Sequence, residues 1–215
     1  MKVRTSYELS VQLSTLSTWR KHELKNLQSF FKTTQKAPLA LAKGALLLTY
    51  AHWEGGIKDM AAAYLHHVEQ QKCLRKELQP AFLALASIGA IKAAAESNAI
   101  QPYIQAVDYI ITSHDHRYQL PNIKLVDTES NLSSKVFRNI LACIGLQLEW
   151  RQFEAKQRLI DTALLATRND IAHNGISNRE DLLLGELIGE VLELLVQFAT
   201  VIENAAATKA YRVAT

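Results

Sequence analysis

Residues 6–32 read SYELSVQLSTLSTWRKHELKNLQSFFK, and apolar side chains recur in this stretch every three to four positions. The apolar positions are Leu9, Leu13, Leu16, Leu24, Leu27 and Phe31. This period places them along one face of a helix, whereas a half-buried strand would alternate at every second residue. The stretch therefore predicts a long amphipathic α-helix near the start of the fold.

The next part of the chain predicts more helical sequence, up to an irregular connection. Pro38 opens a second long block that runs to about Leu78. Pro80 precedes a segment rich in small residues, 81–95, which could pack closely against its neighbours. Over 111–130 the periodicity fades and turn-forming residues appear, so we expect one long irregular connection there, with short extended pieces.

Three helices are predicted after this connection. Residues 131–134, Asn-Leu-Ser-Ser, offer capping side chains for the first of them. The second runs over about 151–173, and Asn-Gly at 174–175 stops it because both residues tolerate the left-handed conformation of a helix C-terminus. A capping box at 177–180, Ser-Asn-Arg-Glu, opens a final helix to about Ala207.

The composition agrees with an all-α fold. The chain of 215 residues contains only 8 Gly and 4 Pro, so it has few residues that form tight turns. Ala, Leu, Gln, Glu and Lys, which all favour helices, are abundant. With 48% hydrophobic residues the chain can bury a sizeable core, and we expect residues 1–215 to form a single helical-bundle domain.

The protein is expected to be cytoplasmic. Cys73 and Cys143 are too few for a disulfide scaffold in a chain of this size. Residues 1–10 lack the apolar core of a signal peptide, and no uninterrupted apolar stretch is long enough to span a bilayer. The net charge is +3, and residues 1–80 carry 12 Lys or Arg against 6 Asp or Glu. This basic part could attract a polyanion, or its charges could simply be solvated helix faces.

The segment Arg168-Asn169-Asp170-Ile171-Ala172-His173 is the best candidate for a functional site. The partial negative charge at a helix C-terminus favours a protonated imidazole at His173, and histidine can transfer protons near neutral pH. Arg168 can clamp a phosphate with two parallel hydrogen bonds. Asn169 lies four residues before His173, on the same helix face, and can orient the imidazole or bind the phosphate.

The spacing within this segment also motivates a homodimer. Residues five apart on a regular helix point about 140° away from one another, so Arg168 and His173 would not meet cleanly within one chain. A cleft between two copies, each contributing one helix end, would bring an arginine and a histidine together. We therefore expect a second copy of the chain as a partner.

Three segments in order resemble the HEPN superfamily. Residues 168–173 are similar to its Arg-x4-6-His motif, including the polar residue directly after the arginine. Residues 52–58, His-Trp-Glu-Gly-Gly-Ile-Lys, resemble the Trp-Glu-Gly segment on the second helix of some prokaryotic HEPN groups. Residues 129–133 resemble their Asn-Leu-Ser helix start. The resemblance covers about 40–200 and is greatest to the MAE-like subgroup; Asn174 departs from it, because many relatives have Gly there.

This resemblance implies a HEPN-like helical bundle, commonly dimeric, that acts as a metal-independent endoribonuclease. The RNA 2′-hydroxyl would attack the adjacent phosphate and leave a cyclic phosphate, often in toxin–antitoxin or phage-defence systems. Arg168 would bind or stabilise the phosphate, His173 would do the acid–base work and Asn169 would assist, with Glu54 and Asp170 in support. The implied partners are RNA, a second copy and an antitoxin or regulatory protein; no cofactor or metal is implied.

Several alternatives stay open. Arg168 could belong to a structural helix cap, paired with Asp161 or Asp170. The domain could also be an inactive HEPN-like module that binds RNA, a nucleotide or a protein partner, or the antitoxin or scaffold half of a pair. Trp53 is interpreted as a core anchor rather than a base-stacking platform. The two histidines of segment 114–116 are interpreted as part of an exposed loop rather than metal ligands.

Overall fold

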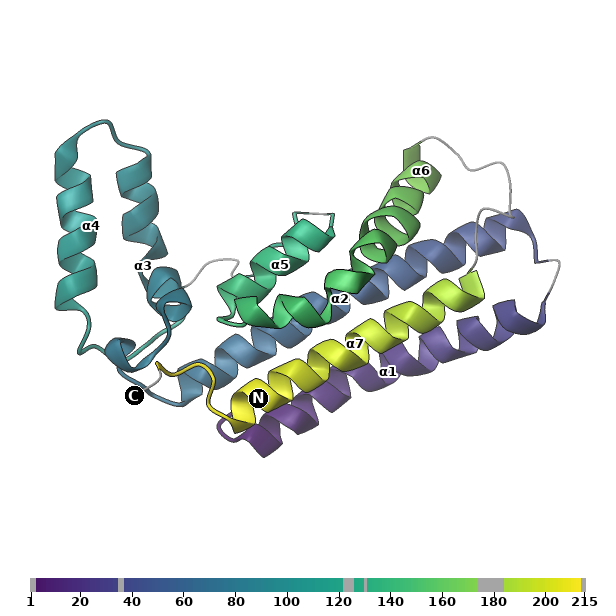
Figure 1. Ribbon diagram of the computed structural model, residues 1–215, viewed down its shortest axis with the longest axis horizontal. Coiled ribbons are helices and arrows are strands. Elements are labelled where there is room, and N and C mark those ends of the chain that lie inside the picture. Colours follow the sequence, from purple (N-terminus) through teal and green to yellow (C-terminus); the bar gives the residue numbers. More distant parts are fainter. Residues whose placement is uncertain (1–2, 35–36, 122–125, 130, 174–183, 214–215) are drawn as a thin grey trace.

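Three long helices lie side by side and form the body of the fold: α1 (Ser6–Thr33), α2 (Leu39–Gln70) and α7 (Leu184–Ala207) (Figure 1). The computed structural model describes residues 3–34, 37–121, 126–129, 131–173 and 184–213. The predicted all-α fold is confirmed, while the predicted stop at 174–175 and capping box at 177–180 lie outside the described residues. Within the described ranges, no helix is long and apolar enough to cross a membrane.

The close packing of α2 against its two long neighbours depends on a pair of glycines. A Cβ atom at Gly55 would lie 3.0 Å from Nη1 of Arg20 on α1. A Cβ atom at Gly56 would lie 2.6 Å from Cδ2 of Leu195 on α7, closer than two carbon atoms can approach. Glycine therefore lets the helices approach at this level. The preceding Trp53 is fully buried, which confirms its interpretation as a core anchor.

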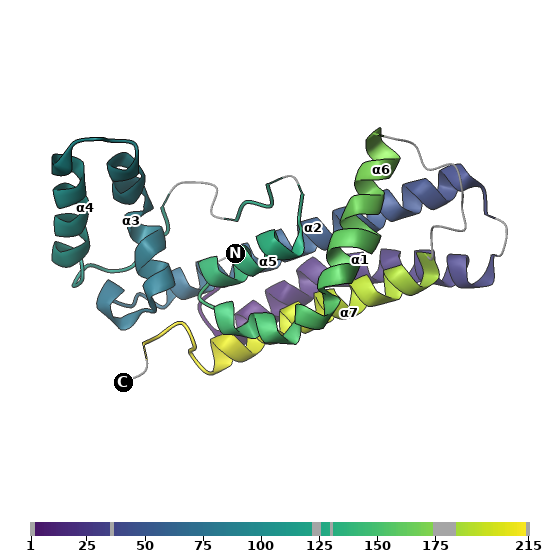
Figure 2. The same ribbon diagram turned by 45° about the horizontal axis from the view of Figure 1, so that its top comes forward.

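A helical hairpin stands at one end of this body. The short 3-10 turn η1 (Arg75–Glu77) follows α2, and α3 (Pro80–Ala95) and α4 (Ile100–Thr112) then run side by side (Figures 1 and 2). The sequence-based prediction does not include α4. It is also wrong at the start of the irregular connection, because Ile111 and Thr112 form the last turn of this helix.

The segment 114–117 pairs with η1 at the base of the hairpin. The backbone N–H groups of Arg75 and Lys76 donate to carbonyl oxygens of this segment at 3.0 and 3.1 Å. The side chains of Lys76 and Asp115 form an ion pair at 2.6 Å. A short extended piece of the expected kind is therefore present here, and the segment serves to hold the chain together. No group of three or more His, Cys, Asp or Glu in the described part of the chain is arranged to hold a metal ion.

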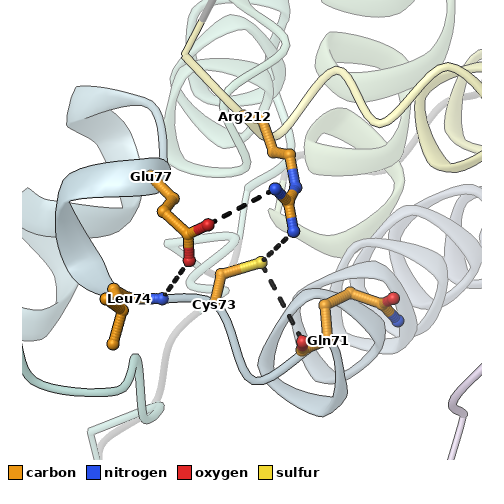
Figure 3. Close-up of polar contacts among 5 residues, drawn as sticks. All are labelled: Gln71, Cys73, Leu74, Glu77 and Arg212. Carbon is orange, nitrogen blue, oxygen red and sulfur yellow. Dashed lines mark hydrogen bonds and ion pairs between the residues drawn. The ribbon is translucent and has the colours of Figure 1, made fainter.

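The C-terminal segment is tied to the same turn (Figure 3). The guanidinium of Arg212 donates to Sγ of Cys73 at 3.2 Å and to Oε1 of Glu77 at 3.4 Å. The other carboxylate oxygen of Glu77 accepts the backbone N–H of Leu74 at 2.6 Å. Burial raises the pKa of the Cys73 thiol. Cys73 forms no disulfide, and it acts as a buried anchor for the C-terminal arginine.

The helix predicted from 131–134 is present as α5 (Ser134–Cys143), and Ser133 caps it by accepting the N–H of Val136 at 3.2 Å. The helix predicted over about 151–173 is present from 157 onward, because two 3-10 turns, η2 (Gln147–Gln152) and η3 (Glu154–Lys156), precede it. It includes the π-helix η4 (Leu159–Ala166) and ends as the α-helix α6 (Thr167–His173). π-Helical turns are rare and occur frequently at functional sites.

Candidate active site

Arg168 lies at the centre of the candidate site, near the start of α6. Its side chain is partly buried, and its guanidinium carbon lies 5.1 Å from the ring centroid of Tyr50 on α2. Its Nη1 donates to Oδ1 of Asn169 at 2.7 Å and to Oδ1 of Asn131, in the segment before α5, at 3.5 Å. An aromatic face and two amide oxygens orient the guanidinium without neutralising its charge.

Tyr50 connects this arginine to the segment before α5. The Tyr50 hydroxyl oxygen accepts the buried backbone N–H of Leu132 at 2.7 Å, and the hydroxyl lies close to the carboxylate of Glu54, one helical turn further along α2. Burial is the main cause that raises the pKa of Tyr50 to about 12; the Leu132 N–H opposes this rise and the nearby Glu54 charge adds to it. The phenol therefore stays protonated at neutral pH and can donate its proton to Glu54.

Glu54 connects the same group of residues to Thr128, in the segment before α5. Its Oε1 accepts the hydroxyl of Thr128 at 2.5 Å. Thr128 in turn accepts, through its carbonyl oxygen, the backbone N–H of Asn131 at 2.9 Å. Glu54 thus lies next to the Arg168 site, and it acts on Arg168 through Tyr50 and through the turn that carries Asn131.

Asp161, on η4, ties the helix that leads into α6 to the start of α5. Its two carboxylate oxygens accept the backbone N–H of Ser134 at 2.7 Å and the hydroxyl of Ser134 at 2.6 Å. A carboxylate at the N-terminus of a helix such as α5 is favoured by the helix dipole. Asp161 is therefore occupied by α5, which argues against the alternative in which it pairs with Arg168 as a structural cap.

The remaining residues of the predicted site lie further along α6. His173 is exposed at the last described position of the helix, and Asp170 is exposed on α6. Asn169 and His173 are one turn apart and share a helix face. Because Arg168 bonds to the Asn169 side chain, the guanidinium is drawn toward the face that carries the histidine. A cation, an amide and an imidazole are thus presented along one short helix.

The network contains residues that the sequence-based prediction missed. Tyr50 is absent from it, although it stands four residues before Glu54 and so shares a face of α2 with it. Asn131 is predicted only as part of a helix start, whereas its side chain contacts Arg168. The partial resemblance of 129–133 to a family motif was a signal for a site role, which a capping interpretation alone does not explain.

Fold and site together define an all-α protein of HEPN type. The family model described as HEPN_MAE_28990-like HEPN matches residues 9–211, and the chain therefore belongs to this family. The likeness expected over about 40–200 is confirmed and extends to α1. No curated protein and no solved structure gives a match.

Proposed function

We propose that the protein is a metal-independent endoribonuclease, with the α6 segment as its catalytic site. The observation that carries this proposal is the way Arg168 is held: Tyr50, Asn131 and Asn169 fix its guanidinium with neutral groups, from three separate parts of the chain. A cation oriented in this way can still bind a phosphate. Membership of a HEPN family supports the proposed nuclease function, because nucleases are frequent in the superfamily.

The proposed reaction cleaves one phosphodiester bond of RNA without a cofactor. The ribose 2′-oxygen bonds to the adjacent phosphorus as the 2′-hydroxyl loses its proton, and the bond from phosphorus to the 5′-oxygen breaks. The products are a 2′,3′-cyclic phosphate and a 5′-hydroxyl, whose oxygen takes up a proton. His173 transfers protons in this step, while Arg168 stabilises the charge on the phosphate oxygens and Asn169 orients either group.

Cleavage of a defined RNA by purified wild-type protein, in the presence of EDTA, tests this proposal. Arg168→Ala and His173→Ala should each lower the cleavage rate by about 100-fold or more, since phosphate stabilisation and proton transfer are each worth about that much. Arg151→Ala and His66→Ala are matched controls, because both side chains are exposed and lie on other elements, η2 and α2. A cyclic phosphate on the upstream product is the expected end group.

Two results would count against the proposed reaction. Activity that survives either α6 substitution means that the nuclease site lies elsewhere or belongs to a contaminant. Wild-type protein that binds RNA but never cleaves it favours the inactive, RNA-binding alternative. Activity that requires a divalent metal contradicts the proposed mechanism while leaving the substrate class intact.

A cleft shared between two copies is part of the proposal. Arg168 and His173 are five residues apart on α6, and an arginine from one copy could act with a histidine from the other. Mixing Arg168→Ala and His173→Ala proteins tests this, because a mixed dimer would contain one cleft with both side chains. Half of the dimers would be mixed and one of their two clefts intact, so about a quarter of wild-type activity should return. Mixtures that stay inactive indicate that each chain uses its own pair.

A role in a toxin–antitoxin or phage-defence system, with an antitoxin or regulatory protein as a partner, follows from the family rather than from the geometry. Expression of the wild-type protein in a bacterial host should arrest growth, and His173→Ala should relieve the arrest. A host that grows equally well with both proteins argues against a toxin. Co-expression with the product of a neighbouring gene then identifies an antitoxin by the return of growth.

A further inference from the structure

The outer face of α4 carries an apolar stripe that no other described element covers. Five large side chains, each 45% to 71% exposed, form it: Ile100, Tyr103, Ile104, Val107 and Ile111. They fall within a narrow arc of the helix, and the steps of four, three and four residues between the aliphatic members match the seam of a coiled coil. The opposite side of α4 faces α3, where Ala106 is buried.

The hairpin presents this stripe in a fixed orientation. The buried guanidinium of Arg75, on η1, donates to the hydroxyl of Ser113 at 2.6 Å and to the hydroxyl of Tyr109 at 3.0 Å. The same guanidinium lies 5.1 Å from the centroid of the Tyr109 ring. The C-terminal end of α4 is therefore anchored to the turn after α2, so the apolar stripe is a preformed surface.

The charge of the hairpin limits what can cover the stripe. Within residues 80–112 the only Lys, Arg, Asp or Glu residues are Lys92, Glu96 and Asp108, and α4 itself carries Asp108 alone. A helix that binds a membrane surface carries Lys and Arg on its polar face, and α4 has neither. A polyanion such as RNA needs the same cations. A second copy of α4 can bind without these cations, because the stripe itself is uncharged and two copies of it bring no like charges together.

We propose that α4 is a dimerisation surface, on which the α4 helix of a second copy packs to make a four-helix arrangement of two hairpins. At roughly 100 Å² for each exposed side chain, the stripe offers about 500 Å² on each copy, or about 1,000 Å² for the pair, the lower bound of a specific interface. A two-fold axis across the seam pairs the same patch on both copies. Helix pairs with such a seam are the basic unit of four-helix bundles.

This surface is separate from the proposed nuclease site. The α3–α4 hairpin follows the C-terminal end of α2, whereas Arg168 contacts Tyr50 in the N-terminal half of α2, and Figure 1 shows the hairpin and α6 at opposite ends of the molecule. Dimerisation through α4 therefore leaves both α6 segments accessible. Its test measures mass, so it can fail or succeed independently of RNA cleavage.

Light scattering coupled to size-exclusion chromatography, over a wide concentration range, tests the proposal. The wild-type protein should form a species of at least twice the mass of the chain, and Val107→Glu should halve that mass. Val196→Glu is the matched control, because Val196 on α7 is 44% exposed and Val107 is 55% exposed. Both changes place a good helix former on a helix surface, and circular dichroism should show unchanged helix content.

Cross-linking provides a second measurement at the stripe itself. Ile104→Cys should be joined to its own copy by a short bismaleimide, whereas Val196→Cys should not. A wild-type protein that is monomeric at every concentration overturns the proposal, and its sedimentation with lipid vesicles would then assign the stripe to a membrane. An oligomer whose mass Val107→Glu leaves unchanged also overturns it, because the contact must then lie on another face.

Discussion

Removing a single oxygen from Tyr50 should both destabilise the fold and disturb the candidate site. In Tyr50→Phe the ring remains against the Arg168 guanidinium, so the aromatic contact is retained. What is lost is the hydroxyl that accepts the Leu132 N–H at 2.7 Å and that lies close to Glu54. Leu132 is fully buried, and its N–H therefore has no access to water as a substitute.

The magnitude follows from that buried donor. A buried N–H left without its partner costs about 1–3 kcal/mol. For a chain of this length, each kcal/mol lowers the melting temperature by about 2–4 °C. We expect Tyr50→Phe to lower the free energy of unfolding by about 2 kcal/mol and the melting temperature by about 4–8 °C.

Tyr64 supplies a control on the same helix. It is also fully buried, but its hydroxyl has no hydrogen-bond partner among the described residues. Tyr64→Phe therefore removes a polar atom whose burial was uncompensated, and it should be neutral or stabilising. The two variants make the same chemical change, so the difference between them isolates the contribution of the Tyr50 contacts.

Urea unfolding followed by circular dichroism measures the difference directly, and RNA cleavage under native conditions measures its effect on the site. Asn131 adjoins Leu132 and contacts Arg168, so Tyr50→Phe should lower cleavage even when the protein is fully folded. Equal stabilities for Tyr50→Phe and Tyr64→Phe would refute the reasoning. A lower stability with unchanged cleavage would show that the network supports the fold without positioning Arg168.

Gly56→Ala should lower the free energy of unfolding by about 1–2 kcal/mol, because the new Cβ atom would lie 2.6 Å from Leu195 Cδ2. Gly44→Ala on the same helix meets nothing within 4 Å and should raise the free energy of unfolding by about 0.5–1 kcal/mol in the same urea titration. Burial lowers the pKa of His67, so the folded state favours its neutral form; stability should be full above the unfolded pKa of about 6.5 and fall as the pH drops below it. Melting temperatures at pH 7.5 and pH 5.5 should show this fall, and His67→Gln should reduce it. Asp161→Asn should raise the hydrogen-exchange rate at the N-terminus of α5 and lower cleavage; unchanged exchange there would mean that this carboxylate does not hold the start of α5.

The sequence predicts the long helices because their burial is periodic along the chain. The leucines of α1 and the capping residues before α5 act locally, so their effect can be deduced from spacing alone. The helix α4 is different. Its apolar positions have a helical period, but one face of this short helix is buried against α3 while the other is exposed, and nothing in the local sequence marks where the irregular connection begins.

The interior of the candidate site could not be deduced from spacing for a related reason. The contacts of Arg168 with Tyr50 and Asn131 join positions far apart in the chain, and the helix that precedes α6 is a π-helix rather than an α-helix. A π-helix changes the number of residues per turn, so the face on which Arg168 emerges cannot be projected from a regular helix. The family resemblance identified the residues, and the tertiary structure supplied their partners.

The residues within a segment that resembles the HEPN superfamily have different roles, and these roles can be distinguished only in the structure. In the Trp-Glu-Gly segment, Trp53 anchors the core and the glycine at position 56 admits Leu195, while Glu54 alone turns to the site. Glu54 reaches Arg168 through Tyr50, and a phenol between a carboxylate and a guanidinium keeps the two charges from forming a direct ion pair. In the proposed nuclease, this arrangement would position the arginine while its charge stays available to a phosphate. Substituting Tyr50 therefore probes the site more sharply than substituting Glu54.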